Sequence, residues 1–265
     1  MNDTYEIYAV KYAHHGPRMA SLNFIGGDPH ETSHDLDFYV WAVFNKDRTI
    51  VVDTGFDETM AKRRDRTILK PVASALAAAG IAPEKVDDVI ITHLHYDHSG
   101  NYDAFPNARY HLQDCEMDFA TGRCMCDEKM RVAFEADDVT ALVRKVFAGR
   151  VAYHDGDEQL APGISVHHIG GHSKGLQAVK VKTARGDVVL ASDGVHLYEH
   201  LDQNKVFPIT YSADDAVAGY AKLRKLAPSV NHIIPGHDPA VLQRYPAPTD
   251  ALKGWVARLD AEPTL

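Results

Sequence analysis

The stretch that decides the fold is Val89-Ile90-Ile91-Thr92-His93-Leu94-His95-Tyr96-Asp97-His98-Ser99-Gly100. Its first part is an apolar, β-branched run, which predicts a buried strand over residues 88–92. Residues two apart on a strand point the same way, so we expect His93 and His95 to project together from the strand end. Asp97 and His98 follow where the chain should turn, and they predict a second group of polar side chains beside the first pair.

These four side chains have the chemistry of metal ligands. Three imidazoles and a carboxylate suit zinc, with iron, manganese or cobalt as substitutes. A His-x-His-x-Asp-His run directly after a buried strand has little packing rationale, so the alternative of four polar residues at a helix start is weak. The spacing indicates two adjacent metal sites.

The remaining pattern surrounds this segment with strands and helices. Strands are expected over residues 6–12, 38–44, 49–52, 108–112, 163–169, 178–183, 187–191 and 232–234. Helical periodicity is expected over residues 71–79, 113–121, 128–147, 212–226 and 248–259. Strands interspersed with helices, with hairpins besides, predict an α/β fold in which mixed sheets are covered by helices. No linker or repeat divides the chain, so residues 1–265 are expected to form a single domain.

At this point the sequence resembles a known family. His93-x-His95-x-Asp97-His98 is similar to the signature of the metallo-β-lactamase superfamily. The family's other elements follow in order: an aspartate after an apolar strand, a histidine among glycines, an aspartate at a strand end and a last histidine after a strand, which are Asp53, His172, Asp193 and His237. The resemblance implies an αββα sandwich, with two mixed β-sheets flanked by helices and the metals at one edge.

The resemblance also implies a ligand set and a cofactor of two Zn²⁺ per chain, with Fe, Mn or Co as substitutes. One metal would be held by His93, His95 and His172, and the other by Asp97, His98 and His237, with Asp193 bridging. Asp53 is expected behind the ligands, where a carboxylate orients their rings. Glycines beside His172 and His237 would let the loop backbones approach a crowded centre.

Such a centre predicts hydrolysis. Two dications lower the pKa of a shared water, and the bridging hydroxide attacks a carbonyl without any serine or cysteine nucleophile. Asp97 is a candidate catalytic group, because its equivalents in this superfamily are thought to relay a proton to the leaving group.

Three features resemble the N-acyl-homoserine lactonase group: the hairpin over residues 37–55, a helical insertion over residues 113–147 near the pocket, and Phe207-Pro208 before a helix. The resemblance implies opening of an N-acyl-homoserine lactone or a related lactone. The alternative is a thioester or other carboxylic ester hydrolase of the glyoxalase II type, although that enzyme's C-terminal helical domain is missing. One departure is that lactonases carry a tyrosine three residues after the bridging aspartate. Here His196 takes that place. Either His196 polarises the carbonyl instead, as we predict, or the substrate is not an acyl-homoserine lactone.

Composition bounds the partners and the location. Lys+Arg 28 against Asp+Glu 37 gives a net charge of −9, which argues against nucleic acid and anionic membranes and for a small-molecule substrate. Cys115, Cys124 and Cys126 lie in one short stretch, which suits a reducing compartment and a cytoplasmic location. No apolar run suits a leader or a membrane span. The sequence leaves open whether the chain forms a homodimer.

Two further segments are rich in charged residues or histidine. The mixed charge run over residues 62–66 is expected to be a solvated helix face. His14 and His15 are expected in an irregular N-terminal stretch, which is either a surface loop or a cover over the pocket.

Overall fold

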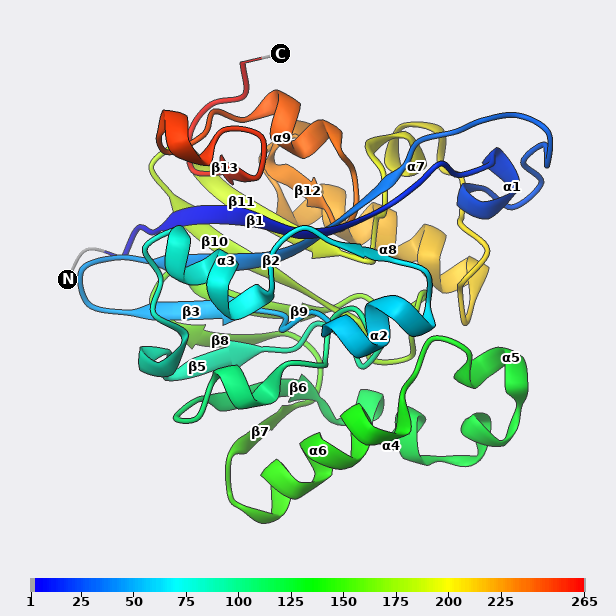
Figure 1. Ribbon diagram of the computed structural model, residues 1–265, viewed down its shortest axis with the longest axis horizontal. Coiled ribbons are helices and arrows are strands. Elements are labelled where there is room, and N and C mark those ends of the chain that lie inside the picture. The colour runs from blue at the N-terminus through cyan, green and yellow to red at the C-terminus, as the bar shows by residue number, and fades with distance from the viewer. Residues whose placement is uncertain (1–2, 265) are drawn as a thin grey trace.

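The computed structural model describes residues 3–264, and it contains two β-sheets packed face to face (Figure 1). The first sheet has the order β13 (Val256–Arg258), β1 (Glu6–His15), β2 (Leu36–Phe44), β3 (Thr49–Val52), β5 (Asp88–Ile90), β6 (Arg109–Gln113) and β7 (Val151–His154), with β4 (Thr67–Ile68) paired to β1. The second has the order β12 (Ile233–Pro235), β11 (Gly186–Ser192), β10 (Gln177–Thr183), β9 (Ile164–His168) and β8 (Glu158–Ala161).

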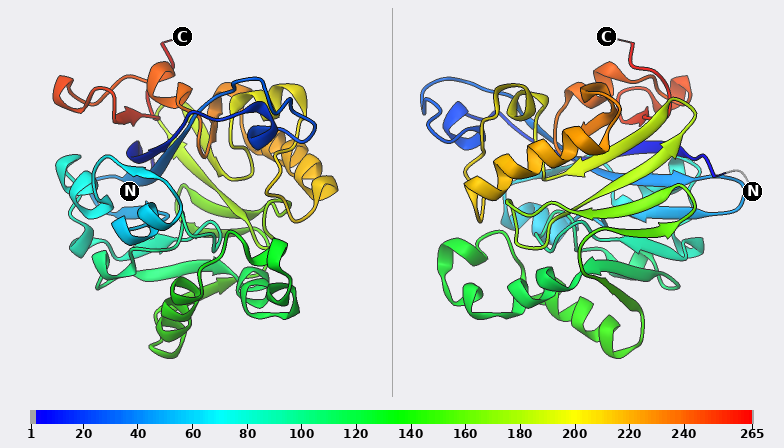
Figure 2. Two further views of the ribbon diagram at one scale, coloured as in Figure 1. Left: turned by 45° about the vertical axis from the view of Figure 1, so that its right-hand side comes forward. Right: turned by 180° about the vertical axis from the view of Figure 1, so that it is seen from behind.

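Helices cover the outer faces of both sheets, as the turned views of Figure 2 show. The α-helices within residues 3–264 are α1 (Ala20–Asn23), α2 (Glu58–Arg63), α3 (Val72–Ala78), α4 (Asp114–Thr121), α5 (Glu128–Arg131), α6 (Ala136–Phe147), α7 (Tyr198–Gln203), α8 (Ala213–Leu226) and α9 (Ala240–Arg244). The αββα layering expected from the sequence is confirmed.

The core lies in three layers that follow from this arrangement. Between the sheets, Trp41 and Ile50 of the first pack against Leu190 of the second. Outside the first sheet, α2, α3, α4 and α6 bury their apolar faces, and outside the second, α8 does the same with Tyr220 and Leu223. Fully burying each such side chain stabilises the fold by about 1.5–3 kcal/mol, so both sheets are fixed relative to each other.

Strand direction brings several chain segments to one edge of the sandwich. In the first sheet β3 and β5 are parallel, and β2 is antiparallel to both β1 and β3. The carboxyl ends of β1, β3 and β5 therefore meet the start of β2 at the same edge. In the second sheet β11 is parallel to β12 and antiparallel to β10, which is antiparallel to β9, so the last residues of β9, β11 and β12 also share an edge.

Several expected elements differ from the structure. A helix over residues 248–259 is wrong: Val256–Arg258 forms β13 instead, because its buried side chains extend the sheet along β1. A continuous helix over residues 128–147 is also wrong. It breaks between α5 and α6, where Tyr96 donates its backbone N–H to the Ala133 carbonyl. Strands β7 and β8 were not foreseen. No helix within residues 3–264 is long and apolar enough to cross a membrane.

Candidate metal centre

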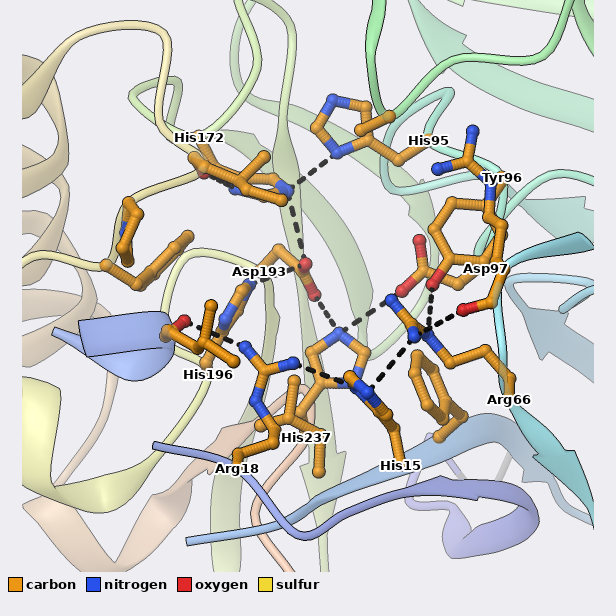
Figure 3. A pocket seen from close by; sticks show the side chains of 18 of the residues that line it. His15, Arg18, Arg66, His95, Tyr96, Asp97, His172, Asp193, His196 and His237 are labelled. Carbon is orange, nitrogen blue, oxygen red and sulfur yellow. Dashed lines mark hydrogen bonds and ion pairs between the residues drawn. The ribbon is translucent and has the colours of Figure 1, made fainter. Parts of the chain in front are cut away.

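The histidines and aspartates predicted as metal ligands lie together at the shared edge of the two sheets. Figure 3 shows five of them: His95, Asp97, His172, Asp193 and His237. Strand β5 ends at Ile90, so the expectation that His93 and His95 extend from a strand is wrong in its detail. The loop after β5 nevertheless places their rings side by side, with centroids 4.5 Å apart. His172 follows β9, Asp193 follows β11, and His237 follows β12.

The first set of donor atoms comes from His93, His95 and His172. One ring nitrogen from each lies within 4.8 Å of the others, and all three side chains are buried. Nδ1 of His95 is 2.8 Å from Nε2 of His172. Three imidazoles that present nitrogens to one point are a common ligand set for zinc.

The second set is formed by Asp97, His98, Asp193 and His237, again within 4.8 Å. Asp193 stands between the two sets. Its Oδ1 lies 3.0 Å from Nε2 of His237 and 3.2 Å from Nε2 of His98, whereas its Oδ2 lies 3.2 Å from Nε2 of His172. Each carboxylate oxygen thus faces one set, which is the arrangement that a bridging ligand requires.

A buried ligand atom without a hydrogen-bond partner is a second observation that fits a bound metal ion. Nε2 of His93 is buried and makes no hydrogen bond with any of residues 3–264. Buried polar atoms in proteins are nearly always paired. An unpaired ring nitrogen within a cluster of ligand-type side chains is accounted for if a cation lies beside it.

The outward-facing ring nitrogens are held by the surrounding structure. Nδ1 of His98 lies 2.7 Å from Oδ2 of Asp53, Nδ1 of His172 is 2.6 Å from the Ile209 carbonyl oxygen, and Nδ1 of His237 is 3.0 Å from that of Asp37. A donated Nδ1–H at each place leaves the Nε2 lone pair free to face the centre. Each ring therefore has its orientation and its tautomer fixed from behind.

The backbone beside the centre is strained and crowded. Asp53 and Ser192 are non-glycine residues with positive φ angles of 62° and 46°. Such strain collects at functional sites, and here the side chains of both residues contact Thr92. A Cβ on Gly236 would come within 2.7 Å of Oδ1 of Asp193. The glycine before His237 therefore permits the close approach that the sequence predicted.

Glu116 on α4 is a functional residue that sequence reasoning missed. Its carboxylate is fully buried, and it accepts hydrogen bonds from the backbone N–H of Leu94 at 2.9 Å and of Gly175 at 2.7 Å. It thereby ties the loop of His93 and His95 to the loop of His172. A glutamate in the first turn of a helix normally stabilises the helix dipole at the surface, so no sequence signal distinguished this one.

The pKa shifts divide the imidazoles around an ionised carboxylate into two groups. Burial would lower the pKa of His98 and of His237, but the charge of Asp193 outweighs it and raises both. Burial, together with neighbouring histidines, lowers the pKa of His93 and of His95 well below its usual value. Burial alone would raise the pKa of Asp193, but the surrounding imidazoles, led by His237, hold it well below its usual range. The carboxylate is therefore charged, and the two lone-pair donors are available at neutral pH.

His196 lies in contact with this centre. Its Nε2 is 2.8 Å from Oδ2 of Asp193, and its ring stacks on Phe207 with centroids 3.5 Å apart. Tyr198, the nearest tyrosine after Asp193, packs instead in the core between the sheets under Arg244. A histidine and not a tyrosine therefore faces the pocket at this point of the loop.

Two connected cavities lie over the centre. The metal pocket has a volume of about 110 Å³ and is lined by Asp97, Asp193 and His196. A larger groove of about 740 Å³ shares His95 and His172 with it and is walled by apolar side chains, namely Phe119, Met130, Val132, Ile209 and Tyr211.

The expectation that residues 62–66 form a solvated helix face is wrong in part. Helix α2 ends at Arg63, and Arg64 and Arg66 turn toward the metal pocket and line it. His15 also lines this pocket, but as the last residue of β1 and not in an irregular loop. His15 reaches the pocket because β1 runs toward the edge of the sheet that holds the metal centre.

Comparisons with known proteins agree with this geometry. Residues 38–237 match the sequence profile of the metallo-beta-lactamase superfamily. The chain is 25% identical over 221 residues to the N-acyl homoserine lactonase AiiA of Bacillus thuringiensis subsp. kurstaki. The aligned region covers 77% of this chain and 82% of that protein.

Solved structures give the same fold. A quorum-quenching N-acyl homoserine lactone lactonase superposes with a TM-score of 0.74 at 22% identity, covering 90% of this chain and 94% of that one. An N-acyl homoserine lactone hydrolase, solved with its product N-hexanoyl-L-homoserine at the catalytic metal centre, superposes with a TM-score of 0.71 at 20% identity, covering 90% and 94%.

Proposed function

The chain belongs to the metallo-beta-lactamase superfamily, and from that premise we propose that it is a metal-dependent hydrolase that opens a lactone ring. The observation that carries this proposal is Asp193, whose two carboxylate oxygens face two separate sets of buried ligand atoms. The curated relatives with which it aligns over most of its length are N-acyl homoserine lactonases, so a lactone of this kind is the proposed substrate class.

We assign two metal ions, zinc for preference, to the two sets. His93, His95 and His172 would hold one ion and Asp97, His98 and His237 the other, with Asp193 shared and Asp53 supporting His98 from behind. When bound, such a pair of ions supplies an activated water and polarises the carbonyl of the substrate. No cysteine or serine nucleophile is needed.

Two side chains are proposed to act on the reacting groups directly. His196 lines the metal pocket, and its Nε2 faces Oδ2 of Asp193. If that oxygen binds a metal ion, the single N–H of the ring would be free to donate to the lactone carbonyl oxygen. Asp97 lines the same pocket and is proposed to deliver a proton to the alkoxide that leaves when the ring opens. Stacking on Phe207 fixes the plane of the His196 ring, so its donor direction is set in advance.

The larger groove is the proposed site of the acyl chain. Its walls come from residues 113–147, which we take as a helical insertion of a single domain, and from the loop of Ile209 and Tyr211. An apolar groove that opens onto the metal pocket suits an aliphatic chain joined to a polar ring. We also assign a reducing, cytoplasmic compartment, because Cys115, Cys124 and Cys126 are free thiols.

A hydrolysis panel on metal-replete protein tests the proposal. γ-Lactones with short and long acyl chains should be turned over, and thioesters, β-lactams and phosphodiesters should be poorer substrates. Efficient cleavage of a thioester with no opening of any γ- or δ-lactone would reject the lactonase proposal and favour the glyoxalase II type. The geometry of the metal centre would stand in either case.

Asp97 provides a second discrimination. A tethered alkoxide is a poor leaving group, whereas a thiolate leaves with less assistance. Asp97→Asn keeps the size but removes the basicity, so it should reduce lactone turnover more than turnover of a thioester with the same acyl group. Equal losses for both substrates would show that Asp97 serves only to hold the metal.

A further inference from the structure

Three cationic or imidazole side chains form one wall of the metal pocket. Nη1 of Arg18 lies 2.8 Å from Nδ1 of His15, and Nη1 of Arg66 lies 3.1 Å from Nε2 of the same ring. Figure 3 shows Arg18, His15 and Arg66 in a row beside His237 and Asp97. All three are half-buried and line the pocket.

This row has more hydrogen-bond donors than acceptors. A guanidinium group only donates, and a neutral imidazole has one acceptor nitrogen and one N–H. Both ring nitrogens of His15 face a guanidinium, so one of the two contacts sets a donor against a donor. Burial and the two guanidinium groups lower the pKa of His15 to about 4, which keeps the ring neutral at physiological pH. The wall therefore lacks an acceptor.

Within the described part of the chain, the two arginines of this wall are also without an ion pair, although Asp97 and Asp193 line the same pocket. No carboxylate within residues 3–264 forms an ion pair with Arg18 or Arg66. Arg18 uses its other nitrogens on Asn23 and the Leu22 carbonyl, and Arg66 donates to Tyr96 and to backbone carbonyls. Burial, then the charge of Arg66, lowers the pKa of Arg18 to about 10. Two crowded positive charges remain.

Neighbouring Arg64 lines the same pocket but, unlike Arg18 and Arg66, has a carboxylate partner. Its guanidinium lies over the ring of Tyr96 and pairs with Glu135, which also binds Arg63. The contrast is sharper because the whole chain has a net charge of −9. A concave patch of positive charge in an acidic protein attracts small anions.

We propose that Arg18 and Arg66 bind a carboxylate on the substrate, so that among the lactones this site opens, one that carries a carboxylate is preferred to an uncharged one such as an N-acyl homoserine lactone. This inference rests on the proposed function for the lactone ring, and adds to it the chemical class of the ring's substituent. A carboxylate matches the fork of a guanidinium in two parallel hydrogen bonds. A carboxylate would supply the acceptor that His15 cannot give to both arginines.

Matched substrates test the proposal by activity. A γ-butyrolactone with a ring carboxylate should be turned over with a higher kcat/KM than its neutral carboxamide. Arg18→Gln and Arg66→Gln should each lower kcat/KM for the carboxylate by roughly 10–100-fold, the usual factor for a hydrogen bond to a charged group. Both should leave the carboxamide within about threefold. Arg63→Gln is the control, since it removes a charge from the end of α2 whose side chain is exposed and lies outside the metal pocket.

The result expected of a merely structural role is different. If the arginines only hold Asn23 and Tyr96 in place, the glutamine variants will lose activity on both substrates by the same factor and will melt earlier. Equal losses would overturn the inference. Arg66→Lys, which keeps the charge but not the fork, should recover part of the preference for the carboxylate.

A binding measurement separates this inference from the proposed function. Calorimetry on metal-loaded protein compares dicarboxylates from succinate to adipate with monocarboxylates of equal length. At least one dicarboxylate should bind about tenfold more tightly than the monocarboxylate of equal length. The double variant Arg18→Gln/Arg66→Gln should remove that difference. If the difference appears but no lactone is opened, the anion site stands and the lactonase proposal fails. If lactones are opened but neither assay shows a preference for the charged form, the lactonase proposal stands and the anion site is rejected.

Discussion

The metal centre and the walls of its pocket are built in different ways. The centre lies where strands of both sheets end, and its histidines are less than 10% exposed, with ring nitrogens held by Asp53, Asp37 and Ile209. The walls come from the segments between strands, where Leu22 is 53%, Val132 is 54% and Ile209 is 50% exposed. A rigid frame thus carries the reacting groups, while loops that tolerate change determine which substrate reaches them.

The largest effect is expected at the centre of the rigid region. Asp193→Ala removes the carboxylate that faces both ligand sets and leaves the buried histidines without a counter-charge. Activity should fall by at least ~10³-fold, and metal content should drop below two ions per chain. Metal analysis alongside lactone turnover checks both. A variant that keeps two ions and most of its activity would contradict a bridging role.

His196 stands at the border of the two regions. His196→Ala should depress kcat by roughly 10–1000-fold, the range for loss of one hydrogen-bond donor to a carbonyl oxygen, with metal content unchanged. His34→Ala is the control, because that ring is exposed and pairs with Glu199. Wild-type kcat in His196→Ala would assign His196 to packing against Phe207 alone.

Glu116 tests whether the support behind the ligands matters. Glu116→Gln turns one acceptor into an amide N–H₂, which sets a donor against the N–H of either Leu94 or Gly175. The loops of His95 and His172 should loosen, with roughly 10–100-fold weaker metal affinity. Competition with a chelator measures this. Glu128→Gln, at an exposed carboxylate, is the matched control, and equal affinities would show that the tie between the loops is dispensable.

Ile209 belongs to both regions, and its side chain should give the smallest effect. Its carbonyl holds His172, and its side chain lines both the groove and the metal pocket. Ile209→Ala keeps the backbone contact and removes apolar surface, so kcat/KM should fall about 3–10-fold for long acyl chains and hardly at all for short ones. A loss that does not depend on chain length would place the acyl group elsewhere.

The same division explains what the sequence could predict. The ligand residues were identified because strand ends followed by His and Asp form a pattern within a few residues, and the order of Asp53, His172, Asp193 and His237 extends it along the chain. The layers followed from hydrophobic periodicity, as with the helix over residues 212–226, which the structure places at Ala213–Leu226.

What the sequence could not predict depends on contacts between distant segments. Glu116 meets Leu94 across 22 residues and Gly175 across 59, and nothing local to α4 signals its burial. Arg66 looked like part of a solvated helix because its charge run is mixed in sign, yet its side chain reaches His15, which is 51 residues away. Strand β13 was taken for a helix because only its pairing with β1 makes it a strand.

The most direct test of the account is a titration of metal-free protein with zinc, followed by metal analysis and by opening of an acyl-homoserine lactone in the same samples. The two ligand sets around Asp193 predict that turnover rises until two ions are bound per chain and then stays constant. A plateau at one ion, or two bound ions with no lactone opening, would contradict the account.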